Sequence, residues 1–228
     1  MSDDALVDER YYQVVPSGSL AERVLVAARD RIYADFVRRI RPQPGDRLLD
    51  AGVSDVTSPA ANLLERLYPH PGQITAVGLG SAMDFIKAFP PVTYQQIEPH
   101  APLPFADQSF DIACSNAVVE HLGSTEHQRR FVAELARVAR RVFITVPNRL
   151  FPVEHHTALP LAAWTDPTFR LATKLTRRAE WSDPANLILM SPRRLRALCP
   201  PGRRGQVGIA GLKLGPFSSN LYLAIDES

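Results

Sequence analysis

Polar and apolar positions along the 228-residue chain follow two spacings in turn. Near the N-terminus apolar residues recur every three or four positions, and Ser19 and Glu22 have the spacing of a capping box at the start of this segment. We predict a helix that ends at about Arg41, because two prolines follow. The next apolar run, residues 47–53, is too short for a helix and ends in a polar turn, which indicates a buried strand.

The same alternation continues through the middle of the chain. Ser58 and Pro59 have the residue types of a helix start, as do Thr125 and Gln128 before a later amphipathic segment. Strands that alternate with helices imply a parallel sheet covered on both faces. The further strands predicted in this region span residues 74–79, 92–97, 110–115 and 141–146.

The pattern changes after Pro147. Residues 148–190 contain both tryptophans and several prolines, with one predicted helix near 168–178. Such a stretch is too long for a plain connection and indicates an inserted lid. Beyond it we expect a short helix and then two strands, at 206–210 and 221–225, which are close enough in sequence to pair antiparallel.

Composition restricts the class of protein. Hydrophobic residues make up 45% of the chain and charged residues 22%, as in an ordinary globular domain. The chain has no run of 18 apolar residues, and its acidic N-terminus lacks the pattern of a signal peptide. The two cysteines offer neither a disulfide framework nor metal-ligand spacing. We therefore expect a cytoplasmic protein without a membrane span.

Charge is unevenly distributed, although the net charge is only +2. Residues 1–121 contain 10 basic and 16 acidic side chains, whereas residues 122–204 contain 15 and 6. A basic surface of this kind can attract an anionic substrate, a membrane or nucleic acid, but solvated arginine-rich helix faces are the simpler explanation. Because no aromatic residues are interleaved with the arginines, we expect no nucleic-acid partner.

The first candidate site follows the first predicted strand. In an open parallel sheet, ligands bind beyond the carboxyl ends of the strands. Gly52 lets the backbone pass close to a ligand there, and Asp50 can accept hydrogen bonds from a cationic amine. The helix predicted after Ser58 would turn amide groups toward a carboxylate. A zwitterionic ligand would suit both features, although many α/β proteins end a strand in Asp-x-Gly for structural reasons alone.

Three linked segments make the chain resemble a known family. Gln96-Ile-Glu98 ends the third predicted strand, Leu103-Pro-Phe-Ala-Asp-Gln-Ser-Phe-Asp111 leads into the fourth, and Ser115-Asn-Ala-Val-Val-Glu-His121 ends it. In this order they resemble the class I S-adenosylmethionine-dependent methyltransferases, in particular the group labelled methyltransferase type 11. The resemblance covers about residues 45–148.

The resemblance implies an α/β, Rossmann-like methyltransferase fold. Its sheet is mostly parallel and seven-stranded, with an antiparallel C-terminal strand, helices on both faces and a lid after the fifth strand. The cofactor is S-adenosylmethionine and the product S-adenosylhomocysteine. We expect a single domain over residues 1–228: an N-terminal helical cap (1–44), a cofactor-binding core (45–147), a lid or acceptor insertion (148–190), and a C-terminal helix and strand pair (191–228).

The family's glycine-rich loop is only partly present. Asp50 and Gly52 match its first two positions, whereas Ser54 and Val56 stand in place of the last two glycines. The acidic residue that usually ends the second strand and holds the ribose is replaced by Gly78. That contact must be missing or supplied from elsewhere.

Three further cofactor contacts are carried over from the family. Glu98 corresponds to the acidic residue beside the adenine, and Asn116 to a position that lines the cofactor pocket. Leu79 follows the second strand at the level of the ribose. Asp84 is a candidate substitute for the missing carboxylate.

Catalysis by such an enzyme needs little covalent help, because the sulfonium already activates the methyl group. The protein aligns the acceptor, excludes water and in some cases removes a proton. Glu154, His155 and His156 directly follow the fifth strand and are the candidates for that base. One histidine in solvent and one packed in the lid is the structural alternative. We expect no metal, because adjacent residues on a strand point apart and no further ligands are evident.

Two aromatic pairs have an open role. Trp164 and Trp181 are candidates for the apolar walls of an acceptor pocket, and they can equally be core residues of the lid. Tyr11 and Tyr12 are placed to fold over the cofactor entrance or to pack on the first helix.

The sequence leaves two functions in competition. The first is methyl transfer to an O, N or C atom of a small-molecule acceptor. The second is a non-catalytic relative with a binding or regulatory role, which the missing glycines and the missing carboxylate favour. A nicotinamide-dependent oxidoreductase fits poorly, because Gly-x-Gly-x-x-Gly is absent after the first strand. Neither the acceptor nor the oligomeric state follows from the sequence.

Overall fold

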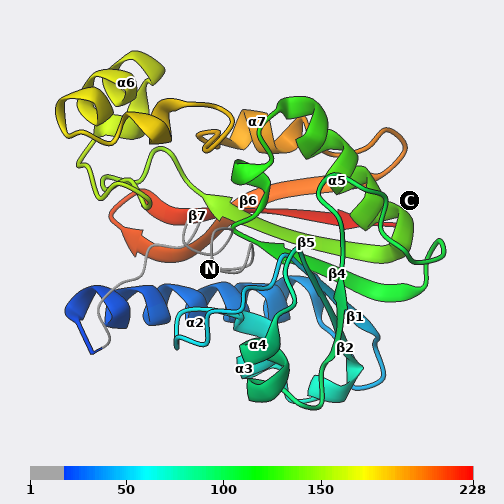
Figure 1. Cartoon of the computed structure of the whole chain (residues 1–228). Coiled ribbons are helices and arrows are strands. Elements are labelled where there is room, and N and C mark those ends of the chain that lie inside the picture. The colour runs from blue at the N-terminus through cyan, green and yellow to red at the C-terminus, as the bar shows by residue number, and fades with distance from the viewer. Residues whose placement is uncertain (1–17, 228) are drawn as a thin grey trace.

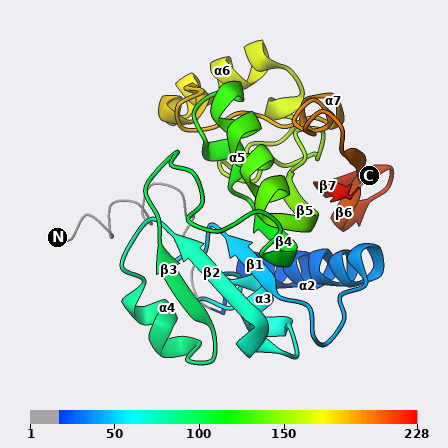
Figure 2. The same cartoon turned by 90° about the vertical axis from the view of Figure 1, so that its right-hand side faces the viewer.

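Seven strands form one mixed sheet in the order β3-β2-β1-β4-β5-β7-β6 in the computed structural model, which describes residues 18–227 (Figure 1; Figure 2). The five strands from β3 to β5 run parallel, and β7 is antiparallel to both β5 and β6. This arrangement confirms the predicted fold class. The strands are β1 (Leu48–Ala51), β2 (Ile74–Gly78), β3 (Thr93–Gln96), β4 (Phe110–Asn116), β5 (Ala139–Pro147), β6 (Arg204–Leu214) and β7 (Phe217–Asp226).

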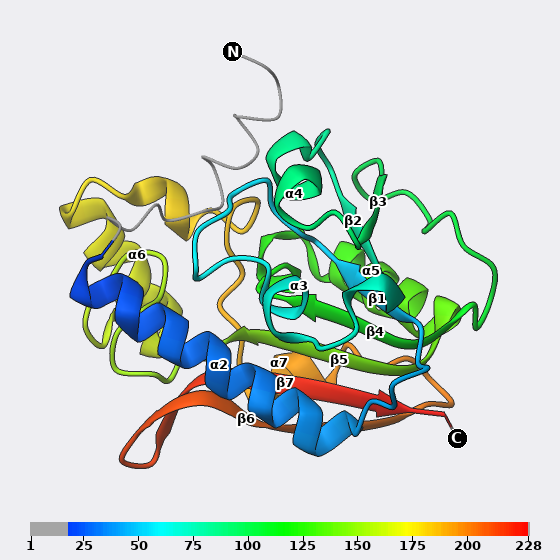
Figure 3. The same ribbon diagram turned by 90° about the horizontal axis from the view of Figure 1, so that it is seen from below.

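Helices cover both faces of the sheet, as the alternating pattern predicts. On one face α2 (Leu20–Ile40) lies across β5, β7 and β6 (Figure 3). Its Phe36 is buried and packs edge-on against Phe143 of β5, with ring centroids 5.6 Å apart. The remaining helical segments are α3 (Leu63–Leu67), α4 (Met83–Ala88), α5 (Thr125–Val138), α6 (Asp166–Leu175) and α7 (Pro192–Arg196), with short 3-10 turns η1 (Pro71–Gln73), η2 (Val119–His121), η3 (Ala162–Trp164) and η4 (Ala179–Ser182).

The ends of α2 confirm the capping prediction. The Ser19 side chain accepts a hydrogen bond from the Glu22 amide at 3.1 Å, and the Glu22 carboxylate accepts one from the Gly18 amide at 2.6 Å. At the other end Arg41 has left-handed backbone geometry and stops the helix before the prolines. Local sequence chemistry alone fixes this element.

The helix predicted to start at Ser58 is wrong: α3 begins at Leu63. Asn62 has left-handed backbone geometry, with a φ of 46°, so the helix cannot extend backward through it. Its side chain accepts a hydrogen bond from the Ser54 amide and donates to the carbonyls of Ser54 and Val56. The loop after β1 is therefore held by an asparagine clamp, and the expected amide groups after Ser58 are not at a helix start.

The family segment 103–111 is fixed to α5 by one arginine. The Arg137 guanidinium donates to the Leu103 and Phe105 carbonyls at 2.9 and 2.8 Å and pairs with Glu134 and Asp107, both at 2.8 Å. The Glu134 carboxylate also accepts a hydrogen bond from the Leu103 amide. These contacts hold the loop against the helix, and Leu103 at its start lines the cavity described below.

Residues 148–190 contain a small apolar cluster of their own, apart from the two clusters on the faces of the sheet. Its buried members are Ala162, Ala163, Phe169, Leu187 and Leu189. The role of this segment as a lid remains a prediction. None of the described helices has the length and hydrophobicity that crossing a bilayer requires. Tyr11 and Tyr12 lie outside the described residues.

Candidate active site

A cavity of about 750 Å³ opens beyond the carboxyl ends of β1, β2, β3 and β4. This is the edge of the sheet where the strand order reverses between β1 and β4, the usual ligand position in such folds. Segments from all four strands and from α5 line it. Of the predicted cofactor contacts, Gly52, Leu79 and Glu98 line this cavity, and Asp50 and Asn116 are not among its lining residues. All five assignments remain predictions.

Gly52 forms the turn that opens the cavity. Its φ is +102°, a conformation that residues with a side chain rarely adopt, and its amide donates to the Val77 carbonyl at 2.8 Å. A Cβ at this position would lie 2.3 Å from Cγ2 of Val118, which also lines the cavity. The glycine is therefore required by backbone geometry and by the close approach of the chain after β4.

The end of β2 shows why an acidic side chain is absent there. A Cβ on Gly78 would lie 3.0 Å from both the Val53 carbonyl oxygen and the Tyr94 hydroxyl oxygen. The Tyr94 hydroxyl donates to the Gly80 carbonyl and so occupies this space. Asp84 does not line the cavity, whereas Asp55 does. Asp55 accepts a hydrogen bond from the Phe85 amide in α4, and no sequence motif singled it out.

Asp50 and Glu65 of α3 are both buried, and each carboxyl group affects the pKa of the other. Burial raises the pKa of Asp50 to about 7, although the interaction with Glu65 partly opposes this shift. Burial and the neighbouring Asp50 raise the pKa of Glu65 well above its ordinary value. Both shifts favour the uncharged carboxyl group, and neither oxygen of Glu65 has a hydrogen-bond partner among the described residues.

This carboxyl pair predicts a stability that falls with pH. In the unfolded chain both groups ionise near pH 4, but in the folded chain the pKa of Asp50 is raised to about 7 and that of Glu65 is raised well above its ordinary value. The folded state thus binds more protons, so the stabilising contribution is present below pH 4 and is lost as the pH rises through 7. The slope reaches about 1.4 kcal/mol per pH unit for each proton.

Glu65→Gln is expected to flatten this dependence, because the amide has nearly the same size as the carboxyl group and cannot ionise. Urea unfolding at pH 5, 6, 7 and 8 measures the slope in the parent chain and in the variant. Glu126→Gln, in an exposed ion pair with Arg130, is the matched control and should retain the parent slope. Equal slopes in the parent and Glu65→Gln would contradict the assigned protonation.

Asn116 lies at the end of β4 and joins three elements. Its side-chain oxygen accepts hydrogen bonds from Arg29 of α2 at 2.8 Å and from Thr145 of β5 at 2.6 Å. The Arg29 guanidinium also donates to the Ala60 carbonyl in the loop before α3. Arg29 is a contact that the sequence did not identify, since nothing near it in the chain marks it.

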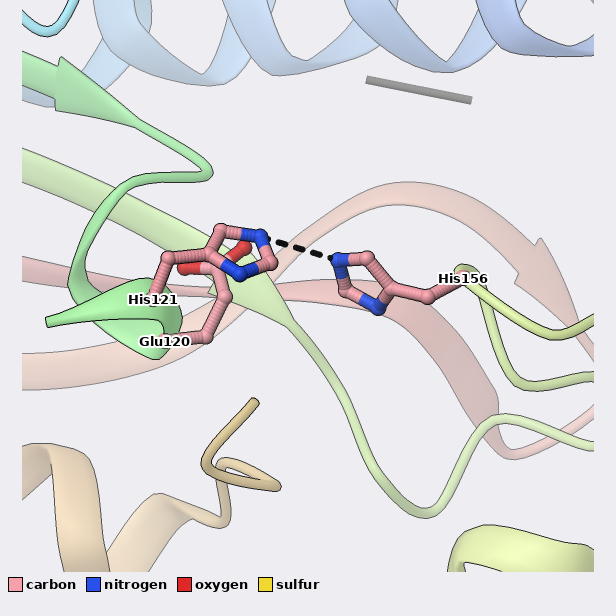
Figure 4. Close-up of side chains that lie close together, drawn as sticks. All are labelled: Glu120, His121 and His156. Atoms are coloured by element: carbon pink, nitrogen blue, oxygen red, sulfur yellow. Dashed lines mark hydrogen bonds between the residues drawn. The ribbon is translucent and has the colours of Figure 1, made fainter. Parts of the chain in front are cut away.

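A set of linked hydrogen bonds connects residues 148–190 to the cavity through His121 and His156, which Figure 4 shows. His121, which lines the cavity, has Nδ1 2.8 Å from the Asn186 carbonyl oxygen. His156 has Nδ1 2.8 Å from Oε1 of Glu154. The Nε2 atoms of the two rings lie 3.1 Å apart. His156 and Glu154, both predicted as catalytic residues, are thus brought together with His121, which ends the family segment after β4.

Glu154 holds one end of these linked hydrogen bonds in place. It is nearly fully buried and accepts hydrogen bonds from the His156 amide and from the Thr157 amide and hydroxyl. Burial alone would raise the pKa of Glu154, but His156 and Thr157 stabilise the carboxylate and lower the pKa to about 2. The carboxylate is ionised at neutral pH and fixes the orientation of the His156 ring.

His155 takes a different direction from its neighbour. Its ring packs edge-on against Phe151 at 5.8 Å, and burial, together with His156, lowers the pKa of His155 to about 4. It is therefore neutral at physiological pH. The structure brings His156, and not His155, into contact with a residue that lines the cavity.

The two tryptophans differ in their position relative to the imidazole rings of His121 and His156. Trp181 lies beside both rings, with centroids 5.1 Å from His156 and 6.4 Å from His121. Trp164 is 41% exposed and pairs with Phe217. Of the two, only Trp181 is placed to form a wall near His121.

Comparison with known proteins defines the class. A family model described as a methyltransferase domain matches residues 49–142. A methyltransferase dependent on S-adenosylmethionine from Thermotoga maritima is similar in structure, with a TM-score of 0.57 and 15% identity over 92% of each chain. Magnesium protoporphyrin IX methyltransferase from Synechocystis, with bound S-adenosylhomocysteine, has a TM-score of 0.59 and 12% identity, covering 99% of this chain and 96% of that one. No curated protein matches the sequence.

The sequence of residues 49–142 is therefore that of a methyltransferase domain, and the fold is the one that S-adenosylmethionine-dependent methyltransferases share. This confirms the predicted class, the prediction of an enzyme and the predicted cofactor. The missing glycines after β1 do not alter the fold, because an asparagine clamp takes over the ordering of that loop.

Proposed function

We propose that this protein transfers the methyl group of S-adenosylmethionine to an O, N or C atom of a small-molecule acceptor. The cavity of about 750 Å³ carries the proposal, because its size is that of a small-molecule site and it lies where this fold binds its ligands. The cofactor would lie between the Gly52 turn and Glu98, with Asp50 behind the turn. The acceptor would approach from the side of His121 and Trp181.

The residues of the chain would act mainly by positioning. The sulfonium supplies the reactive methyl group, so in-line alignment of the acceptor and exclusion of water account for most of the catalysis. Trp181 supplies an apolar surface next to His121, and the Glu154–His156 pair orients the polar groups beside it. If the acceptor atom carries an exchangeable proton, the Glu154–His156 pair would also remove that proton.

A non-catalytic binding role is the competing function. The departures from the glycine-rich loop and the glycine at the end of β2 favour it, since each removes a contact that relatives make with the cofactor. The open cavity favours catalysis, because no described side chain fills the cofactor position.

Calorimetric titration separates the two. The enzyme is expected to bind one equivalent each of S-adenosylmethionine and S-adenosylhomocysteine; the absence of heat with both at high concentration would favour the binding role. Incubation with methyl-labelled cofactor and fractions of a cell extract then tests the acceptor class. Label should appear in the low-molecular-weight fraction, and label confined to nucleic acid or protein would exclude a small-molecule acceptor.

A further inference from the structure

Three potential metal ligands converge at the edge of the cavity. Glu120 and His121 lie in η2, directly after β4, and His156 comes from the segment after β5 (Figure 4). One carboxylate oxygen and one nitrogen from each ring all lie within 4.8 Å of one another. The sequence pattern indicated no metal site, because the residues next to His156 in the chain do not form one. The two further ligands, Glu120 and His121, precede His156 by more than thirty positions.

Both rings are held with Nε2 pointing inward. A carbonyl oxygen can only accept a hydrogen bond, so His121 carries its hydrogen on Nδ1, toward Asn186. The Glu154 carboxyl group, whose oxygens accept hydrogen bonds from the His156 and Thr157 amides, likewise takes the Nδ1 hydrogen of His156. A histidine whose outer nitrogen donates to a carboxylate or a carbonyl is the usual arrangement around a metal ion, because this second contact fixes the tautomer and the ring.

The distance between the inward nitrogens fits shared coordination. Metal–nitrogen bonds of about 2.0–2.1 Å place two ligands of one ion about 2.9–3.4 Å apart, for angles between 90° and tetrahedral. The observed separation of the two Nε2 atoms is 3.1 Å. Without an ion, one of these nitrogens must carry a second hydrogen and make that ring cationic. A protonated imidazole would account for the contact between the two rings, but it would not account for the position of Glu120.

The Glu120 carboxyl group is the third potential ligand. Its side chain is only 1% exposed, and neither of its oxygens has a hydrogen-bond partner among the residues that the structure describes. A buried polar group without a partner costs about 1–3 kcal/mol, and more when it is charged. The nearest cation in α2, Arg29, is engaged with Asn116 and Ala60 and makes no hydrogen bond to Glu120.

We propose that Glu120, His121 and His156 bind one divalent transition-metal ion, with Glu154 as the outer carboxylate. Two imidazole nitrogens and a carboxylate oxygen suit Zn²⁺, Mn²⁺, Fe²⁺ and Co²⁺ rather than Mg²⁺ or Ca²⁺, which prefer all-oxygen sites. With neutral histidines, the two carboxylates contribute two negative charges, which a divalent ion balances. Three protein ligands leave positions for water or for another molecule.

The place of the ion gives it a role in the proposed function. Since His121 lines the cavity, the open positions face the side from which the acceptor would approach. This step rests on the proposed methyl transfer: an acceptor oxygen on the ion would be oriented and would lose its proton more readily. The binding of the metal itself does not depend on that function.

Metal binding is tested on the full chain after treatment with a chelator and dialysis. Titration with Co²⁺ is expected to give one equivalent per chain and visible absorption bands of a nitrogen–oxygen site, and Zn²⁺ should displace the Co²⁺ and raise the thermal midpoint. His156→Ala is expected to weaken Co²⁺ binding at least a hundredfold, and Glu120→Gln, which keeps size and fold, at least tenfold. Glu154→Gln should weaken it about tenfold through the orientation of His156.

A second histidine pair provides the control. His100 and His127 stack at 3.8 Å on another part of the cavity wall and are the alternative source of a metal signal. His127→Ala should leave Co²⁺ binding unchanged. Loss of binding in His127→Ala with retention in His156→Ala and Glu120→Gln would overturn the proposal, as would the absence of stoichiometric binding in the parent chain.

Titration of the same preparations with S-adenosylhomocysteine keeps the two proposals apart. Nucleoside binding without metal binding would overturn only the metal site. Metal binding without nucleoside binding would overturn only the proposed function.

Discussion

Gly52→Ala is expected to weaken the binding of S-adenosylhomocysteine between tenfold and a hundredfold while the protein remains folded. The added methyl group forces a residue with a side chain into a φ of +102°, which costs about 1–3 kcal/mol, and it meets Val118 at 2.3 Å. Both the turn and Val118 line the cavity, so relief of the clash must move the wall against which the nucleoside would lie. Calorimetry gives the affinity, and circular dichroism verifies the fold.

Gly45→Ala is the matched control. This glycine precedes the same strand, and a Cβ there meets no atom within 4 Å. The affinity of the Gly45→Ala variant for S-adenosylhomocysteine should equal that of the parent chain. An unchanged affinity in Gly52→Ala as well would remove the turn after β1 from the cofactor site.

His156→Ala is expected to lower turnover at least a hundredfold with less than a threefold change in the affinity for S-adenosylhomocysteine. The reason is its position: its ring contacts His121 at the cavity wall and does not itself line the cavity. Loss of one group that positions or deprotonates the acceptor costs about 10²–10⁴ in rate. Single-turnover rates, measured once an acceptor is known, separate this effect from binding.

His155→Ala tests the neighbouring position. Because this ring packs on Phe151, we expect its removal to lower the thermal midpoint, whereas the turnover of the folded protein should be largely retained. His70, which packs on Tyr68 and does not line the cavity, provides a substitution that should leave the turnover unchanged. A full turnover in His156→Ala would exclude the lid histidine from catalysis.

The sequence predicted most of the fold because its signals are local. Periodicity, the capping pair at Ser19 and the strand-length apolar runs each depend on neighbours in the chain, and they located α2 and all seven strands. The failure at Ser58 has its cause in a contact between side chain and backbone across eight positions. The Asn62 clamp on Ser54 reverses the backbone locally, and neither residue signals this by type alone.

The site was less predictable for the same reason. The family resemblance pointed to Gly52, Leu79 and Glu98, and all three line the cavity, because the spacing of the motif along the chain reflects position in space. The pairing of His121 with His156 spans 35 positions, and Tyr94 reaches the end of β2 from another strand. No spacing rule links such residues, so the identity of the acceptor-side groups required the three-dimensional structure.

The position of β7 has a consequence for biosynthesis. β7 leaves the ribosome after the other six strands of this sheet, yet it lies between β5 and β6, and in the described structure β6 pairs with no other strand. Until residues 217–226 emerge, β6 has no partner and part of the surface under α2 does not exist. Nascent chains should therefore keep these apolar surfaces accessible to chaperones until β7 has emerged, and a ribosome-stalled chain that ends before Phe217 should remain sensitive to protease.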